Sequence, residues 1–136
     1  MVGQVGVNLG FTKGQVVQEL YYDEDVDQPL RQALAEAIGA EPVSWDYDDL
    51  VDGIILWWRA DDAAEEDLAD ALSDIAQNMA DEGGLIWVFS PKPGRGGEVP
   101  AESITEASDA AGMQATSSIS AGKDWVGIRL VNPPRV

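Results

Sequence analysis

The side chains best suited to bind a ligand follow the ends of apolar segments that read as strands. They are aromatic, cationic or acidic: Tyr22, Asp23, Trp58, Arg59, Lys92, Arg95 and, in the last segment, Trp125. The carboxyl ends of parallel strands meet at one edge of a sheet, so we expect these side chains to border a common groove. There Arg59, Lys92 and Arg95 would grip an anion, while the aromatic rings would stack on a planar group.

The tryptophans have a second interpretation, which is packing in the core. Large aromatic side chains are usually buried beneath helices. Trp57 and Trp87 lie within long apolar runs, so we predict that both are core residues. Trp58 and Trp125 stand beside charged residues and turns, which leaves burial and exposure both open. On the binding interpretation, Trp58→Ala and Arg59→Ala disturb binding more than stability.

The composition removes several kinds of catalytic site. The chain has no histidine and no cysteine, which excludes Ser-His-Asp catalysis, thiolate nucleophiles, disulfides and the usual zinc sites. Adjacent carboxylates occur as Asp48/Asp49, Asp61/Asp62 and Glu65/Glu66. A hydrolase would need two carboxylates held across a cleft, whereas neighbours on a turn point apart. The acidic segment Asp23–Asp27 lacks the glycine of a calcium loop. We therefore expect no catalytic residue, metal or cofactor.

Strand and helix patterns alternate along the chain. Apolar runs predict strands over Gln15–Tyr22, Gly53–Trp58 and Leu85–Ser90, with a short extended piece at Pro42–Trp45. Helical spacing predicts helices over Gln28–Ile38, Asp61–Met79 and Glu102–Ala111. Asp25 or Asp27 would cap the first helix, and Gly83–Gly84 would end the second. Two alternating segments, Gln114–Ser120 and Trp125–Val131, predict a hairpin.

This order predicts a single α/β domain over residues 15–131. It would be a three-layer, Rossmann-like domain with a mostly parallel sheet, helices on both faces and a C-terminal antiparallel hairpin. Residues 1–14 are expected to form an N-terminal arm, and residues 132–136 a tail.

The formal charge of −17 is unevenly distributed. Residues 1–70 contain 17 acidic and 3 basic side chains, and residues 71–136 contain 8 and 5. This acidity opposes binding to nucleic acid or anionic membranes, because both require basic residues against phosphate. Two interpretations of the acidic first half remain. It is a solvated surface that keeps the protein soluble, or a face that attracts a basic partner.

The sequence also predicts a cytoplasmic location. No apolar run approaches the roughly 18 residues that cross a bilayer. The first residues lack the basic and apolar regions of a signal peptide.

Several stretches resemble known proteins. Asp52–Trp58 resembles the acidic residue and the central apolar strand that follows it in methyltransferases. Glu82–Val88 resembles the turn that leads into the next strand of those proteins. Five further stretches are Leu9–Glu19, Tyr22–Asp27, Ile55–Arg59, Pro91–Arg95 and Gly122–Val131. Through these the whole chain resembles a bacterial family, Domain of Unknown Function 3052, which is common in actinobacteria. The family name implies no activity.

The resemblance implies a methyltransferase-like scaffold that lacks the usual cofactor turn. An adenosylmethionine site needs glycine after the first strand so that the backbone can approach the ligand. Here the segment Tyr21–Asp25 has no glycine and places carboxylates there instead. We therefore expect a non-catalytic binding or regulatory module that holds a protein partner. The alternatives are a divergent transferase that binds a nucleoside-type ligand by tryptophan stacking, and a homo-oligomer with tryptophans at its interface.

Overall fold

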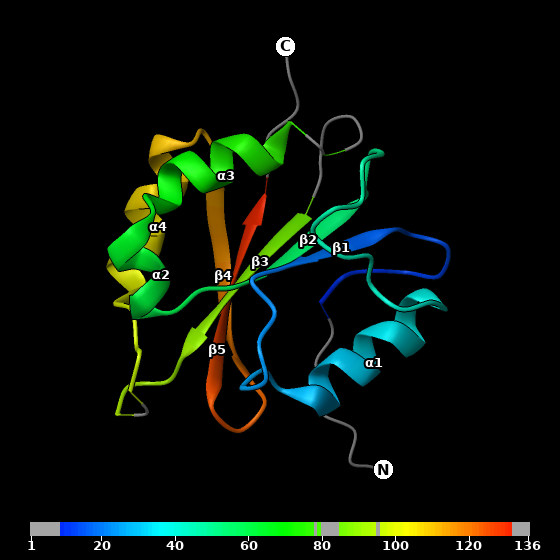
Figure 1. Ribbon diagram of the computed structural model, residues 1–136, viewed down its shortest axis with the longest axis horizontal. Helices are drawn as coiled ribbons and strands as arrows, with labels where there is room; N and C mark the ends of the chain where they lie inside the picture. Colours follow the sequence, from blue (N-terminus) through cyan, green and yellow to red (C-terminus); the bar gives the residue numbers. More distant parts are fainter. Residues whose placement is uncertain (1–8, 78, 80–84, 95, 132–136) are drawn as a thin grey trace.

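The computed structural model describes residues 9–77, 79, 85–94 and 96–131. Five strands and four helices follow one another along the described chain (Figure 1). They are β1 (Val17–Leu20), α1 (Gln28–Ile38), β2 (Gly53–Trp57), α2 (Ala60–Glu65), α3 (Leu68–Ala76), β3 (Leu85–Pro91), α4 (Ala101–Ala110), β4 (Gln114–Ala121) and β5 (Trp125–Val131). The chain is therefore an α/β protein, as its sequence pattern predicts.

The five strands form one mixed sheet in the order β1-β2-β3-β5-β4. Strands β1, β2 and β3 are parallel, whereas β5 runs antiparallel to both β3 and β4. The predicted C-terminal hairpin is confirmed. The expectation of a mostly parallel sheet is not confirmed. After α4 the chain enters β4 at the edge of the sheet, which leaves a gap between β3 and β4. The hairpin then folds β5 back into the gap, so only two of the four pairings are parallel.

Helices pack on both faces of the sheet (Figure 1). Successive side chains of a strand point to opposite faces, and β2 shows this clearly. Ile54 and Leu56 join the core formed with α3 and α4, while Ile55 and Trp57 join the core formed with α1. Because both faces are covered, every residue of β2 is buried. The continuous apolar run in the sequence has this origin.

Residues before β1 belong to the core on the α1 face. Leu9 and Phe11, from the expected N-terminal arm, are both buried. The Phe11 ring lies against Gly53, where an added Cβ would stand 2.1 Å from the ring carbon Cε1. Glycine at the start of β2 is therefore what admits this ring.

Helix α1 has the bounds that its sequence predicts. Asp27 is the N-cap, and its Oδ1 accepts a hydrogen bond from the Leu30 backbone N–H at 2.9 Å. Gly39 ends the helix with a left-handed φ of 82°, which glycine adopts without steric cost. Of the two candidate caps, Asp25 is free for another role.

We predict that Asp27→Ala lowers the free energy of unfolding by about 1 to 2 kcal/mol. The change removes the helix cap, and it also removes the acceptor for the Lys123 backbone N–H, which lies 3.3 Å from Asp27 Oδ2. Urea denaturation measures the loss. Asp27→Asn keeps a capping oxygen, so equal losses for Ala and Asn would contradict this account.

The expected helix over Asp61–Met79 is wrong, because two helices occupy this region. Glu66 has extended backbone angles (φ −137°, ψ 154°), and Asp67 caps α3 by accepting from the Ala69 N–H at 2.8 Å. An aspartate able to cap within an acidic run starts a new helix there. This break changes the direction of the chain between α2 and α3.

Two other predicted features are absent or untested. The short strand at Pro42–Trp45 reduces to a single parallel bridge between Gln18 and Val43. The predicted helix stop at Gly83–Gly84 lies outside the described residues.

Candidate functional site

The segment that follows β1 closes the carboxyl edge of the sheet. It leaves β1 at Tyr21, crosses toward the β4–β5 turn and enters α1 (Figure 1). Trp125 Nε1 donates a hydrogen bond to the Asp25 carbonyl at 3.2 Å. Asp27 Oδ2 accepts from the Lys123 N–H at 3.3 Å. The acidic segment is thus tied to the hairpin across the ends of the parallel strands.

Arg59, the second residue after β2, holds this segment in place. Its Nε and Nη2 donate to the two carboxylate oxygens of Asp25 at 2.8 and 2.5 Å. Its Nη1 donates to the carbonyls of Tyr21 at 3.1 Å and Trp57 at 3.2 Å. The hydrogen bonds from Arg59 also hold the pKa of Asp25 below its usual range. The expectation that Arg59 grips a ligand anion is therefore corrected, because its donors already serve the chain itself.

Trp58 and Trp125 are buried, with 1% and 3% of their surface exposed. The predicted groove with both rings as open stacking surfaces is therefore absent. Alternation explains Trp58: Trp57 points into the core of α1, so the next side chain turns to the core of α3 and α4. The core positions predicted for Trp57 and Trp87 are confirmed.

The remaining predicted site residues do not converge. Tyr22 is half exposed, and the Arg31 guanidinium lies 4.6 Å from its ring centroid. Asp23 is exposed, and its carboxylate accepts from the next backbone N–H. Lys92 Nζ turns to the hairpin and donates to the Gly122 carbonyl at 3.3 Å. Arg95 lies outside the described residues.

Sequence reasoning missed a buried polar cluster around Glu19. This carboxylate accepts from Arg31 Nε at 2.7 Å and Nη2 at 2.8 Å, and from Trp57 Nε1 at 2.9 Å. Glu19 is 7% exposed, so its charge depends on these donors. The available signal was the pair Gln18-Glu19 inside an otherwise apolar strand.

A cavity of about 790 Å³ lies along the outer edge of β1. Trp45 and Tyr22 line it and are 76% and 50% exposed. Gln18 also lines it, and its Nε2 donates to the carbonyls of Ser44 and Trp45 at 3.1 and 3.2 Å. The Gln18 Oε1 is buried without a hydrogen-bond partner. These carbonyls fix the orientation of the amide, since a flipped amide would bring oxygen against oxygen.

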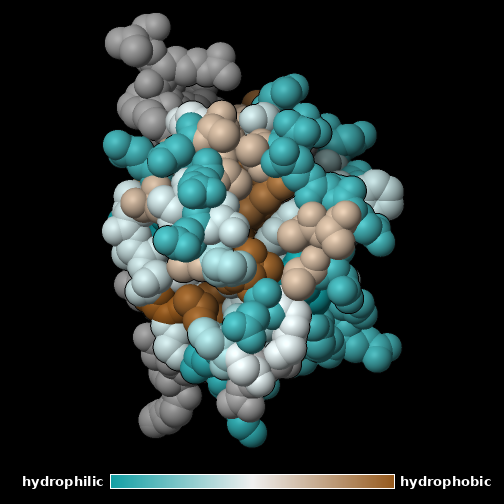
Figure 2. All heavy atoms as spheres, turned by 90° about the vertical axis from the view of Figure 1, so that its left-hand side faces the viewer, coloured by the Kyte–Doolittle hydropathy of each residue, from teal (hydrophilic) through white to brown (hydrophobic). Residues whose placement is uncertain are grey.

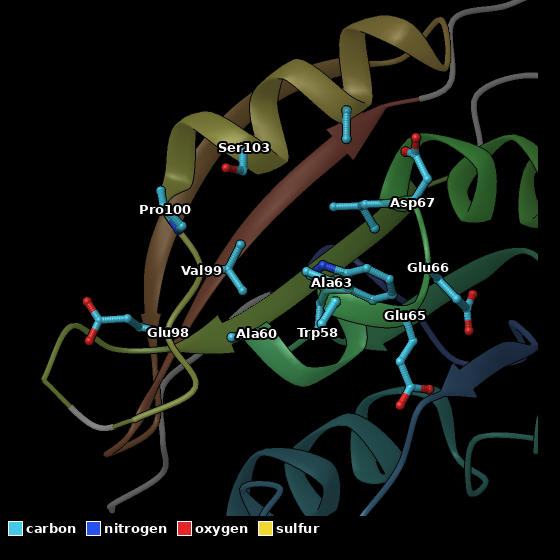
Figure 3. A pocket seen from close by; sticks show the side chains of 13 residues that line it. Trp58, Ala60, Ala63, Glu65, Glu66, Asp67, Glu98, Val99, Pro100 and Ser103 are labelled. Atoms are coloured by element: carbon cyan, nitrogen blue, oxygen red, sulfur yellow. The ribbon is translucent and has the colours of Figure 1, made fainter.

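A second cavity, of about 560 Å³, lies between α2 and α4. Figure 2 looks onto this side of the molecule and shows apolar side chains recessed among hydrophilic ones. In Figure 3, Trp58 lies at the base of this cavity and Val99 projects toward it. Glu98 stands at one side, and Glu65, Glu66 and Asp67 stand at the other. We call this space the α2–α4 cavity.

Two negative findings apply to the described part of the chain. In it, no cluster of three or more acidic side chains is arranged to hold a metal ion. None of its helices has the length and apolar character needed to cross a membrane.

The sequence comparisons find relatives of unknown function. A family described as "Protein of unknown function (DUF3052)" matches residues 6–134. Uncharacterised proteins of Mycobacterium tuberculosis (strain H37Rv) and Mycobacterium bovis are each 42% identical over 125 residues. Each match covers 92% of this chain and 76% of the relative.

The structure comparisons find methyltransferases. The N-methyltransferase NodS of Bradyrhizobium japonicum matches with a TM-score of 0.56 and 12% identity, over 90% of this chain and 88% of that one. A SAM-dependent methyltransferase of Aquifex aeolicus matches with a TM-score of 0.55 and 14% identity, over 91% and 85%. At such low identity the likeness concerns the fold alone, which is α/β and methyltransferase-like.

Proposed function

The chain belongs to the DUF3052 family of proteins of unknown function, and from that premise we propose that it is a non-catalytic binding module on a methyltransferase-like scaffold. The finer architecture that we propose is a degenerate three-layer, Rossmann-like one, which the two helix-covered faces support. Its occupant would be a protein partner in the cytoplasm.

The observation that carries this proposal is the closed carboxyl edge. In methyltransferase-like and other open α/β folds, ligands bind beyond the carboxyl ends of the strands, where glycine lets the backbone approach them. Here Tyr21 takes the left-handed φ of 60° at the end of β1, and Asp25 and Arg59 neutralise each other directly above the strand ends. A cofactor would have to displace this ion pair and meet further carboxylates.

We therefore predict that adenosylmethionine, adenosylhomocysteine and nucleotides do not stabilise the protein. Thermal shift at millimolar ligand measures this, and isothermal titration provides the independent check. A ligand at 100 times its Kd stabilises by about 2.7 kcal/mol, which would be an evident rise in Tm. A saturable rise with any of these ligands contradicts the non-catalytic proposal.

The alternative, a divergent transferase for a nucleoside-type ligand, has one observation in its favour. The cavity beside β1 presents Tyr22 and Trp45 as accessible aromatic surfaces. If the thermal shift is positive, Trp45→Ala distinguishes the sites. Loss of the shift assigns the ligand to this cavity, and retention of the shift excludes it. Trp45 is 76% exposed, so its removal should leave the fold intact.

A further inference from the structure

The indole N–H of Trp58 differs in its hydrogen bonding from those of the other buried tryptophans. The other tryptophans buried in the described chain, Trp57, Trp87 and Trp125, each donate from Nε1 at 2.7 to 3.2 Å. Trp58 is 1% exposed, yet its indole N–H has no hydrogen-bond acceptor among the described residues. The indole N–H of a buried tryptophan usually finds a partner in the protein, whereas this one opens onto a cavity. Because Trp58 lines the α2–α4 cavity, a ligand there can supply the acceptor.

The charge around this cavity selects the kind of ligand. Glu98 lies on the α4 side, and Glu65, Glu66 and Asp67 lie on the side where α2 meets α3 (Figure 3). In the described part of the chain, the ion pairs are Arg31–Glu19, Arg59–Asp25 and Arg59–Asp62, so no Lys or Arg there neutralises these four. Three of them accept a hydrogen bond from the chain: Glu66 from the Tyr21 hydroxyl, Asp67 from the Ala69 N–H and Glu98 from the Gly94 N–H. In Figure 3 the four carboxylates point away from Trp58, so they form an acidic rim around the cavity. Such a rim, in a protein of net charge −17, favours a cationic ligand.

The walls between the charges are apolar and small. They are formed by Ala60, Ala63, Ala64, Val99, Pro100 and Ala107. Small side chains leave room, and they offer an apolar surface to the methylene stem of a long basic side chain. The cavity therefore presents three features in one place: a donor at its base, apolar walls and an acidic rim.

We propose that the α2–α4 cavity binds a basic segment of a protein partner. A backbone carbonyl of that segment accepts the hydrogen bond from Trp58 Nε1. The stem of a lysine or arginine packs on the alanines, and its charged end reaches the acidic rim that includes Glu98 and Glu65. A simple amine supplies the cation without the acceptor, whereas a peptide supplies both. This inference rests on the proposed role as a binding module and specifies the chemistry of the partner.

The test uses the uniformly ¹⁵N-labelled chain with assigned indole signals. The probe is an acetylated, amidated hexapeptide of alternating lysine and leucine. The matched peptide has glutamate in place of lysine, and n-butylamine provides the cation alone. We expect the lysine peptide to shift the Trp58 indole signal saturably while the signals of Trp57 and Trp87 stay in place. The glutamate peptide should shift none, and n-butylamine should bind at least tenfold more weakly than the peptide.

Charge variants test the location. Glu65→Gln with Glu98→Gln should weaken the lysine peptide roughly tenfold. Glu102→Gln with Glu106→Gln removes two exposed carboxylates of α4 that do not line the cavity, and should change the affinity less than about twofold. A Trp58 signal that stays in place at millimolar peptide, or equal weakening by both pairs, overturns the inference. So does n-butylamine binding as tightly as the peptide. None of these three outcomes bears on cofactor binding. The proposed function is tested separately, and a thermal shift with adenosylmethionine would contradict it.

Discussion

Arg59→Met should lower the free energy of unfolding by about 2 to 3 kcal/mol. The Arg59 side chain is 14% exposed, and methionine replaces most of its apolar contact while removing every donor. The carbonyls of Tyr21 and Trp57 then lose the donor that Arg59 Nη1 supplies. The Asp25 carboxylate is 54% exposed, so water replaces much of what the ion pair contributes. Most of the loss therefore comes from the carbonyls, and urea denaturation measures it.

Lys92→Met is the matched control for Arg59→Met. Lys92 also follows a parallel strand, but its ammonium makes one hydrogen bond, to the Gly122 carbonyl. We expect a loss below about 1 kcal/mol for this variant. If Arg59→Met costs no more than Lys92→Met, the closed carboxyl edge does not depend on Arg59, and the observation behind the proposed function is lost.

The same pair gives a pH dependence with a definite sign. Arg59 hydrogen bonds hold the pKa of Asp25 below its ordinary value of 3.8. A carboxylate whose pKa is lowered in the folded state stabilises the fold above its unfolded pKa, and this contribution disappears as the pH falls through the folded pKa. The stability difference between the parent chain and Arg59→Met should therefore narrow below pH 3.8. A difference that stays constant from pH 7 to pH 2 would contradict the role of Asp25.

Local rules predicted the elements that depend on neighbouring residues. The cap at Asp27, Pro29 in the first turn and the stop at Gly39 lie within one helix, and together they fix α1. The break at Asp67 was also local in origin. The helical spacing of apolar residues continues across it, however, and this periodicity hid a capping aspartate. The sheet order could not be predicted in the same way, because the position of β5 depends on where α4 returns the chain.

The candidate site depended on contacts between distant residues. Whether Arg59 faces a ligand or the chain is decided by Asp25, which lies 34 positions earlier. Whether Trp58 is exposed is decided by α3 and α4, which cover that face of the sheet. No spacing within the sequence encodes either contact. The glycine-free turn after β1 was visible in the sequence, and the structure adds that Arg59 and Trp125 fasten this turn across the strand ends.

The largest single loss should follow from Glu19→Ala, at roughly 3 kcal/mol. Glu19 is 7% exposed and joins α1 to the sheet, because it accepts from Arg31 on α1 and from Trp57 on β2. Its removal leaves the Trp57 indole N–H, which is fully buried, without an acceptor. Arg31 is 24% exposed, so its guanidinium recovers part of its hydration, which keeps the loss below that of a fully buried pair.

Two further variants separate the contributions to this loss. Glu36→Ala, at an exposed position of α1, should cost less than about 0.5 kcal/mol and controls for lost charge. Glu19→Gln keeps one oxygen acceptor but not the charge, so it should lie between the parent and Glu19→Ala. If charge pairing with Arg31 dominates, adding Arg31→Met to Glu19→Ala lowers the free energy of unfolding little further. The double-mutant cycle then gives a coupling energy of about 1 kcal/mol or more between the two residues. Additive losses would instead assign the effect of Glu19 to the Trp57 N–H, and the ion pair would then be a consequence of the packing of α1 and not a cause of it.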